Sequence, residues 1–167
     1  FHDNFIRHVV SATVNVTVDA YDFNIEGVTI SNWYNSHAHF SDVNYHAEHR
    51  ALAILIKADK FIMDDCALYG YQDTIELFKG RQYITNTLIT GTTDFIFGSN
   101  NTTIFNNCEI RSILAEDSSG KVVTSGGYIT AFKGSASGDS DYVQYGAIFS
   151  GCNFTADYGV AVSGGDF

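Results

Sequence analysis

The chain has 167 residues and a formal net charge of −10, with 19 acidic side chains (Asp and Glu) against 9 basic ones (Lys and Arg). This charge argues against nucleic acid and against an anionic membrane surface as partners, so we expect the protein to bind neither. With 45% hydrophobic residues the composition is that of a folded protein, and no apolar run approaches the roughly 18 residues needed to cross a membrane.

Short strands are predicted from the N-terminal part onward. Polar and apolar residues alternate over residues 13–18, which favours a strand with one face in a core. Residues 23–30 contain a second run of this kind. No segment has the apolar spacing of an amphipathic helix, so the predicted fold class is all-β.

The histidines all lie in the first 50 residues. They are His2, His8, His37, His39, His46 and His49. Such closely spaced histidines are a pattern that zinc sites use. We expect residues 32–48, however, to form a loop that leaves the main fold, where exposed histidines are unremarkable. The prediction is therefore that the chain has no metal site.

The middle of the chain contains a repeat of 21 residues. Residues 60–70 align with residues 81–91, and just beyond them Asp73 aligns with Asp94. Repeats of 20–50 residues are the signature of stacked units. Each unit here holds short β-branched and aromatic runs separated by Gly, Asn and Asp, which are typical of strands and turns. The architecture that fits is a right-handed parallel β-helix, a solenoid in which each coil packs against its neighbours.

Three cysteines recur within the repeat. Cys66, Cys108 and Cys152 are separated by 42 and 44 residues, and each is the last residue of a similar short sequence. We interpret each interval as two coils, which places equivalent Cα atoms about 9–10 Å apart at roughly 4.8 Å per coil. A disulfide requires Cα atoms within about 7 Å of each other. The expectation is a ladder of buried, free thiols.

A later segment is rich in Gly, Ser and Asp. Residues 134–141 have the composition of a calcium loop, but they lack the terminal glutamate that such a loop places at a fixed distance. We expect a solvated excursion between coils.

Asp73 and Asp94 form a candidate two-carboxylate site, because the repeat places them on neighbouring coils at the same angle around the axis. At about 5–6 Å, like charges push two pKa values apart, so one carboxylate stays ionised as a nucleophile while the other holds a proton. Gln72 offers a neutral amide donor to a developing oxyanion. These groups suffice for ester hydrolysis through an acyl intermediate. The alternative is that the aspartates only cap turns at coil corners.

Several segments together resemble the pectin methylesterase family. They are Tyr-Gln-Asp-Thr at 71–74, Gly-Thr-Thr-Asp-Phe-Ile-Phe-Gly at 91–98, Arg-Gln-Tyr at 81–83, Asn-Cys-Glu-Ile at 107–110 and Ser-Ala-Thr-Val at 11–14. The resemblance implies a right-handed parallel β-helix. It also implies an extracellular esterase that releases methanol from methyl-esterified polygalacturonate, the polymer of pectin. No metal or organic cofactor is implied, and we expect a monomer.

The resemblance carries roles over to individual residues. Asp94 resembles the nucleophile that attacks the methyl-ester carbonyl. Asp73 resembles the general acid that protonates departing methanol and then, as a base, activates water. Gln72 resembles an oxyanion donor, and Phe97 resembles an aromatic wall of the sugar groove, with a core phenylalanine as the alternative.

The chain departs from the family in three places. Arg50 stands where the family has a second oxyanion glutamine, so it is a candidate substrate-binding residue that could instead pair with Asp94. Glu76 replaces a tyrosine that contacts sugar. The family's Leu-Gly-Arg-Pro-Trp segment, whose arginine orients the nucleophile, is absent and would be expected just after Phe167.

These departures shape the expected organisation. Residues 1–167 are predicted to be a single β-helix domain, incomplete at both ends and an internal portion of a longer esterase, so the activity of this segment alone stays open. One alternative is a catalytically silent, pectin-binding β-helix. Another is a pectate lyase or polygalacturonase, which is disfavoured because the extra acidic cluster is missing.

Glycosylation sequons at Asn15, Asn100, Asn101 and Asn153 agree with a secreted glycoprotein of the cell wall.

Overall fold

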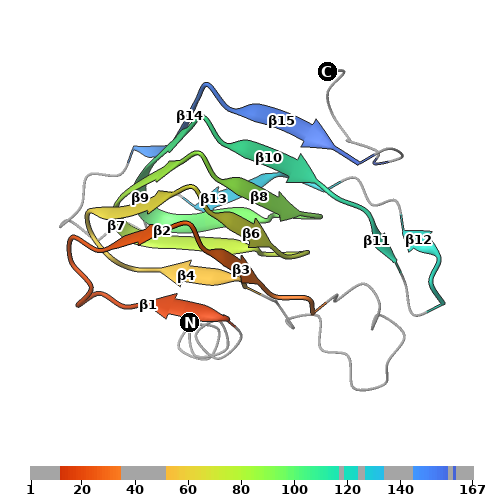
Figure 1. The fold of residues 1–167 in the computed structure, drawn as a ribbon, viewed down its shortest axis with the longest axis horizontal. Coiled ribbons are helices and arrows are strands. Elements are labelled where there is room, and N and C mark those ends of the chain that lie inside the picture. Colours follow the sequence, from red (N-terminus) through yellow and green to blue (C-terminus); the bar gives the residue numbers. More distant parts are fainter. Residues whose placement is uncertain are drawn as a thin grey trace.

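The computed structural model describes residues 12–34, 52–116, 119–123, 127–133, 145–157 and 160. These residues form fifteen β-strands, most of which stack in parallel along one axis (Figure 1). The fold is a right-handed parallel β-helix, as predicted, and crossovers between parallel strands have this hand almost without exception. Among the described residues, no helix is long and apolar enough to cross a membrane.

Each turn of the chain, or rung, contributes strands to three stacks. The first stack contains β1 (Val14–Val16), β4 (Ile54–Ile56), β7 (Ile75–Thr85), β9 (Ile96–Asn106) and β13 (Thr130–Lys133). The long strands β7 and β9 continue into the second stack, which also contains β2 (Asn24–Glu26), β5 (Phe61–Asp64) and β14 (Gly146–Ser150). The third stack contains β3 (Thr29–Ser31), β6 (Ala67–Tyr69), β8 (Leu88–Gly91), β10 (Glu109–Ser112) and β15 (Asn153–Ala156). A small antiparallel pair, β11 (Ala115–Glu116) and β12 (Val122–Val123), follows the third stack.

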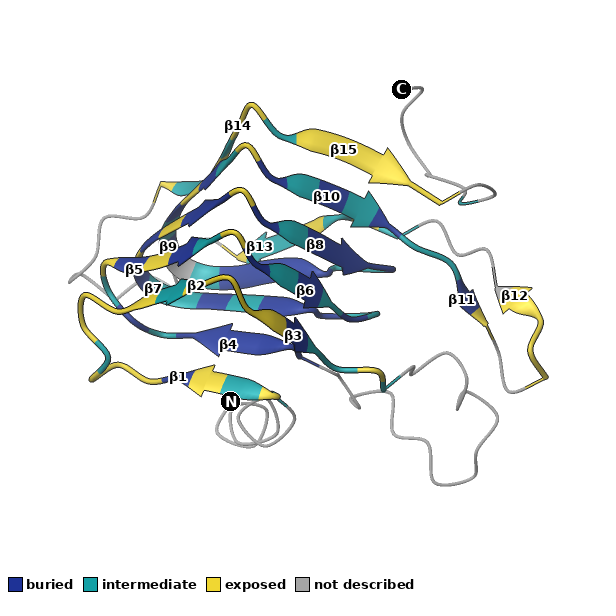
Figure 2. Ribbon diagram, in the orientation of Figure 1, coloured by how far each residue is buried: buried dark blue, intermediate teal, exposed yellow. Residues whose placement is uncertain are grey.

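The 21-residue repeat sets the register of the central rungs. Ile75 pairs with Ile96, and Ile84 pairs with Phe105, between β7 and β9. Because side chains alternate along a strand, this register aligns the inward-facing apolar residues of successive rungs. Figure 2 shows the result: burial is concentrated in the middle rungs, whereas β15 is exposed along its length. The largest fully buried side chains include Phe61, Met63, Leu68, Leu77, Ile84 and Phe105.

The turn between the second and third stacks uses the same backbone conformation on every rung. Asp65, Asn86 and Asn107 have φ values of 50°, 49° and 52°, and Gly27 and Gly151 take the equivalent places at φ 65° and 63°. Asn and Asp are the non-glycine residues that enter this left-handed region most readily. The repeated Asn and Asp therefore close each rung at the same corner.

Side-chain amides link these corners along the axis. The Nδ2 group of Asn107 donates to Oδ1 of Asn86 at 2.7 Å, and Nδ2 of Asn86 donates to Oδ1 of Asp64 at 2.8 Å. The ladder is exposed to solvent, so each of its hydrogen bonds contributes about 1 kcal/mol or less.

Replacement of Asn86 separates the two contributions of this corner. Asn86→Gly keeps the left-handed turn but removes both amide contacts, and we expect it to lower the free energy of unfolding by about 1 kcal/mol. Asn86→Ala removes the same contacts and also places alanine, which has a Cβ atom and no polar side chain, in the left-handed conformation. Its free energy of unfolding should therefore fall further, by about 2 kcal/mol. Urea unfolding monitored by circular dichroism measures both. Equal losses would show that the backbone conformation contributes nothing.

The cysteine spacing predicted from the sequence is correct for one interval and wrong for the other. Thr87 lies on the rung between Cys66 and Cys108, as expected, and the Cys66 amide approaches its hydroxyl at 3.4 Å. Cys152, however, lies on the rung next to Cys108, because Glu109 pairs with Asn153 and the Asn153 amide donates to the Cys108 carbonyl at 2.9 Å. The extra residues of this interval lie between β10 and β13 and between β13 and β14, and a repeat count mistakes them for another rung. The three thiols are free.

Candidate active site

The two signature segments form turns that stack directly on each other. Residues 70–74 connect β6 to β7, and residues 92–95 connect β8 to β9 one rung further on. The Thr92 amide donates to the Tyr71 carbonyl at 2.9 Å, and the Asp73 amide donates to the Thr93 carbonyl at 3.2 Å. The sequence prediction that Asp73 and Asp94 occupy equivalent places on neighbouring rungs agrees with the register of the strands that follow them.

Both aspartates have the left-handed backbone conformation. Their φ values are 63° for Asp73 and 49° for Asp94. For a residue with a Cβ this conformation costs roughly 1–2 kcal/mol, and such strained residues cluster at functional sites. The conformation also breaks the strand alternation, so these side chains are not placed simply inward or outward as in the strands that follow.

Two other signature residues have structural roles that the sequence did not reveal. Thr74 is fully buried, and its hydroxyl donates to the Thr90 carbonyl at 2.7 Å, which fixes the first turn to the next rung. A Cβ atom on Gly91 would lie 2.1 Å from Cβ of Phe95 and 2.7 Å from the Tyr71 carbonyl oxygen. The conformation of both turns thus requires a small residue at 91 and a hydroxyl at 74.

The two carboxyl groups differ in their exposure. Asp73 is only 3% exposed, with its Oδ2 atom buried, whereas Asp94 and Gln72 are partly exposed. The segment just before β13 lies against the second signature turn, since the Asp94 amide donates to the Tyr128 carbonyl at 2.6 Å. Tyr128 itself is 73% exposed. No sequence signal predicted this neighbour, because the chain leaves the stack between β10 and β13.

Phe97 lies on the outer face of the first stack. It pairs in register with Glu76 on one side and Ala131 on the other. Its side chain is 9% exposed and packs with Leu52 and Leu55 in an apolar cluster separate from the main core. Phe97 is therefore a buried residue of this second cluster, and only a small part of its ring reaches solvent.

Glu76 places a carboxylate next to this outer cluster. It lies between Leu55 and Phe97 in the register of the first stack. Burial lowers the pKa of Lys57, and the negative charge of Glu76 acts in the opposite direction on that pKa. A cation and an anion therefore lie close together on the face that carries Phe97.

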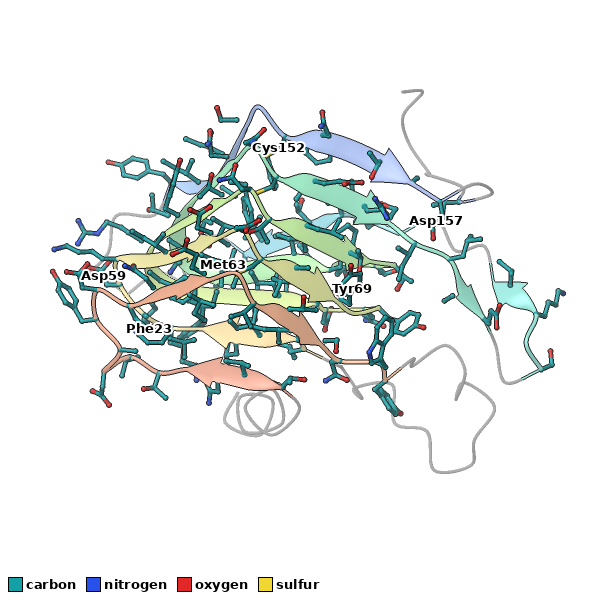
Figure 3. All side chains as sticks on the ribbon, viewed as in Figure 1. Phe23, Asp59, Met63, Tyr69, Cys152 and Asp157 are labelled. Carbon is teal, nitrogen blue, oxygen red and sulfur yellow. The ribbon has the colours of Figure 1, made fainter. Side chains whose placement is uncertain are left out.

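An aromatic group borders the first signature turn. Trp33 stacks on Tyr69 with ring centroids 5.8 Å apart, and it presents an edge to Tyr71 at 6.5 Å. Trp33 is 64% exposed, so this group presents an aromatic surface to solvent. Tyr69 is labelled in Figure 3 at the end of β6.

Some predicted site residues lie outside the described residues. Arg50 is one of them, and Ser11 of the family-like segment 11–14 and the six histidines considered for zinc lie outside them as well. Within the described part of the chain, no group of three or more His, Cys, Asp and Glu side chains could hold a metal ion.

Comparison with known proteins agrees with the fold. The family model for pectinesterase matches residues 4–156. A probable pectinesterase A from Neosartorya fischeri is 37% identical over 103 residues, which are 62% of this chain and 28% of that protein. A probable pectinesterase A from Aspergillus flavus is 31% identical over 154 residues, which are 92% of this chain and 39% of that protein.

Solved structures of pectin methylesterases have the same fold. The enzyme from Yersinia enterocolitica superposes with a TM-score of 0.74 at 33% identity, covering 90% of this chain and 46% of that one. A pectin methylesterase in complex with a hexasaccharide gives a TM-score of 0.72 at 30% identity, covering 91% and 43%. The chain thus spans less than half the length of each of these relatives. Its match over residues 4–156 shows that it belongs to the pectinesterase family.

Proposed function

We propose that the protein containing this chain hydrolyses the methyl esters of pectin and releases methanol. The observation that carries this proposal is the stacking of two turns that place Asp73 and Asp94 on neighbouring rungs, in the same left-handed conformation. Membership of the pectinesterase family and the matching fold of pectin methylesterases support it.

Exposure supports an assignment of roles to the two carboxyl groups. Asp94 is the more accessible and acts as the nucleophile, forming a bond from its carboxylate oxygen to the ester carbonyl carbon. Asp73 is 3% exposed. Burial disfavours the charged form of a carboxyl group, which suits the role of the acid that gives its proton to departing methanol.

The second half-reaction regenerates both groups. Asp73, now a carboxylate, takes a proton from water, and the resulting hydroxide attacks the acyl carbon and breaks its bond to Asp94. The amide of Gln72 donates a hydrogen bond to the oxyanion in both steps. Gln72 directly precedes Asp73 in the same turn, so the acid and the oxyanion donor are positioned together.

The proposed substrate is methyl-esterified polygalacturonate. The small part of the Phe97 ring that reaches solvent would contact a sugar, and Arg50 stays a candidate for contact with the substrate or the oxyanion. With a net charge of −10, the protein gives an anionic polymer no long-range attraction, so local contacts must supply the affinity.

We propose secretion to the cell wall as a monomeric glycoprotein. Two sequon asparagines, Asn15 and Asn153, are exposed on β1 and β15 and are suited to glycosylation. Asn101 is 2% exposed, and its amide donates to the Thr103 hydroxyl at 2.8 Å, so it is not expected to carry a glycan.

Product analysis tests the proposed activity. The full-length protein that contains this chain is incubated with highly esterified pectin, and the released methanol and the newly formed carboxylates are measured. We expect the two in equal amounts, without added metal ions and without unsaturated sugars. Pectin binding without methanol would favour the silent β-helix, and calcium-dependent unsaturated products would favour a lyase.

Gln72→Ala tests the oxyanion donor. Removal of one such donor typically lowers kcat by about 10²–10³, and we expect that loss here with KM nearly unchanged. The split between kcat and KM separates an oxyanion role from simple sugar binding. A rise in KM with an unchanged kcat would assign Gln72 to the groove instead.

Glu76→Gln tests how charge near Phe97 affects substrate preference. Removal of a negative charge beside the groove reduces repulsion of free galacturonate, so we expect kcat/KM on sparsely esterified pectin to rise about two- to fivefold. On fully esterified pectin the value should stay the same, and Glu116→Gln, at an exposed position of β11, is the control. Equal changes on both substrates would show that Glu76 does not discriminate charge.

A further inference from the structure

The rungs of β10 and β15 place two cysteines directly above each other. Asn106 pairs with Ser150, and Glu109 pairs with Asn153, so the intervening residues correspond one to one and Cys108 faces Cys152. Neighbouring rungs lie about 4.8 Å apart. This distance falls within the range of about 4.4–6.8 Å that disulfides span between Cα atoms.

The packing beside the cysteines confirms this close spacing. Phe105 and Phe149, three residues before each cysteine, stack with ring centroids 4.7 Å apart and ring planes 6° apart. The two rungs are therefore parallel and in full contact at this corner. Figure 3 shows Cys152 at the junction of β14 and β15, on the rung next to β10.

The two thiols also have the same orientation. The Cys108 thiol lies 3.4 Å from the carbonyl oxygens of Asn106 and Ile84. The Cys152 thiol lies 3.6 Å from the Ser150 carbonyl and 3.5 Å from the Phe105 carbonyl. Each thiol thus contacts the carbonyl two residues before it and a carbonyl of the preceding rung, so one cysteine is nearly a one-rung translation of the other.

We propose that Cys108 and Cys152 form a disulfide that links these two rungs. Rotation of both thiols about their Cα–Cβ bonds brings the sulfur atoms toward each other without a change of register. Burial raises the pKa of the Cys108 thiol to about 11, and the neighbouring Cys152 thiol contributes to that rise. Cys152 is the more exposed of the two and is the point of attack for an external oxidant.

Glutathione disulfide is the oxidant in the proposed reaction. The Cys152 thiolate attacks one of its sulfur atoms, which forms a mixed disulfide and releases one glutathione thiolate. The Cys108 thiolate then attacks the Cys152 sulfur and releases the second glutathione. The two cysteines lose two electrons and two protons, and two glutathione thiols are formed.

Cys66 is an internal control for this proposal. Its thiol makes the same kind of contact, 3.1 Å from the Asp64 carbonyl, but Thr87 occupies the next rung. Since Cys66 and Cys108 are two rungs apart, about 9–10 Å, no disulfide can join them without a change of backbone.

Peptide mapping tests the pair. The protein is incubated with glutathione disulfide, free thiols are alkylated under denaturing conditions, and peptides are analysed without reduction. We expect a linked pair that contains Cys108 and Cys152 and an alkylated Cys66. Before alkylation, the intact mass should be 2 Da below that of the reduced protein. The Cys66→Ser variant should keep the link, and the Cys152→Ser variant should lose it. Alkylation of all three cysteines, or glutathione retained on Cys152 with Cys108 alkylated, would overturn the proposal.

Thermal unfolding supplies a second readout that does not depend on enzymatic activity. A disulfide between positions 108 and 152 closes a long loop, so the oxidised protein should unfold about 5–10 °C above the dithiothreitol-reduced protein. The difference should persist in Cys66→Ser and disappear in Cys152→Ser. An identical midpoint for oxidised and reduced wild type would contradict a link that stabilises the fold.

Discussion

Asp94→Asn is expected to abolish methanol release while leaving the fold intact. An asparagine has nearly the same shape as aspartate and tolerates the left-handed conformation, with φ at 49°, but its amide is a poor nucleophile. Loss of a covalent nucleophile typically lowers kcat by about 10⁴ or more. Methanol release from esterified pectin measures the loss, and circular dichroism during heating checks the fold.

Asp65→Asn is the matched control for this substitution. Asp65 has the same conformation, with φ at 50°, and is exposed at the opposite corner of a rung. The control should keep wild-type activity, which would show that loss of a charge in a left-handed turn is harmless in itself. Retention of activity by Asp94→Asn would remove Asp94 from the role of nucleophile.

Gly98→Ala is expected to produce the largest loss of stability. A Cβ atom at this position would lie 1.9 Å from the carbonyl oxygen of Leu77, its register partner on β7. Backbone on both sides must shift, because no flexible side chain can move aside. We expect the free energy of unfolding to fall by about 3 kcal/mol or more.

Urea unfolding measures this loss, with Ser99→Ala as the neighbouring control. Ser99 lies on the same strand, is partly exposed and should tolerate alanine within about 0.5 kcal/mol. Because the replacement destabilises the fold, it should also lower activity, in proportion to the folded fraction. A loss below about 1 kcal/mol for Gly98→Ala would show that the two rungs are not held in close contact at this point.

The sequence predicted the fold and the stacking of the turns because both depend on a strict repeat. An interval of 21 residues that preserves strand alternation must place Ile75 next to Ile96, and it therefore stacks the turns that precede them. The Asn and Asp residues at the rung corners mark the left-handed turns in the same way.

The sequence could not predict contacts made after the chain leaves the stack. Excursions are not constrained to any multiple of the repeat, so nothing indicated that Tyr128 lies next to Asp94 or that Cys152 is one rung from Cys108. For the same reason the 44-residue interval between those cysteines was mistaken for two coils. Excursions have no periodic hydrophobic pattern from which their path could be predicted.

The spacing of the repeat also could not predict how the two carboxyl groups differ. Asp73 and Asp94 occupy equivalent positions, and only the resemblance to a family assigned them different roles. Their exposure now provides an independent physical basis, because Asp73 is 3% exposed and Asp94 is not fully enclosed. The proposed roles of the two residues rest on both.

A crystal structure of the Asp73→Asn variant with a fully methyl-esterified hexagalacturonate would test the paired-aspartate site itself. We expect one ester carbonyl carbon within about 3.5 Å of the Asp94 carboxylate, with residue 73 beside the methoxy oxygen and the Gln72 amide toward the carbonyl oxygen. An oligosaccharide bound on another face, or an Asp94 carboxylate directed away from every ester group, would contradict the mechanism.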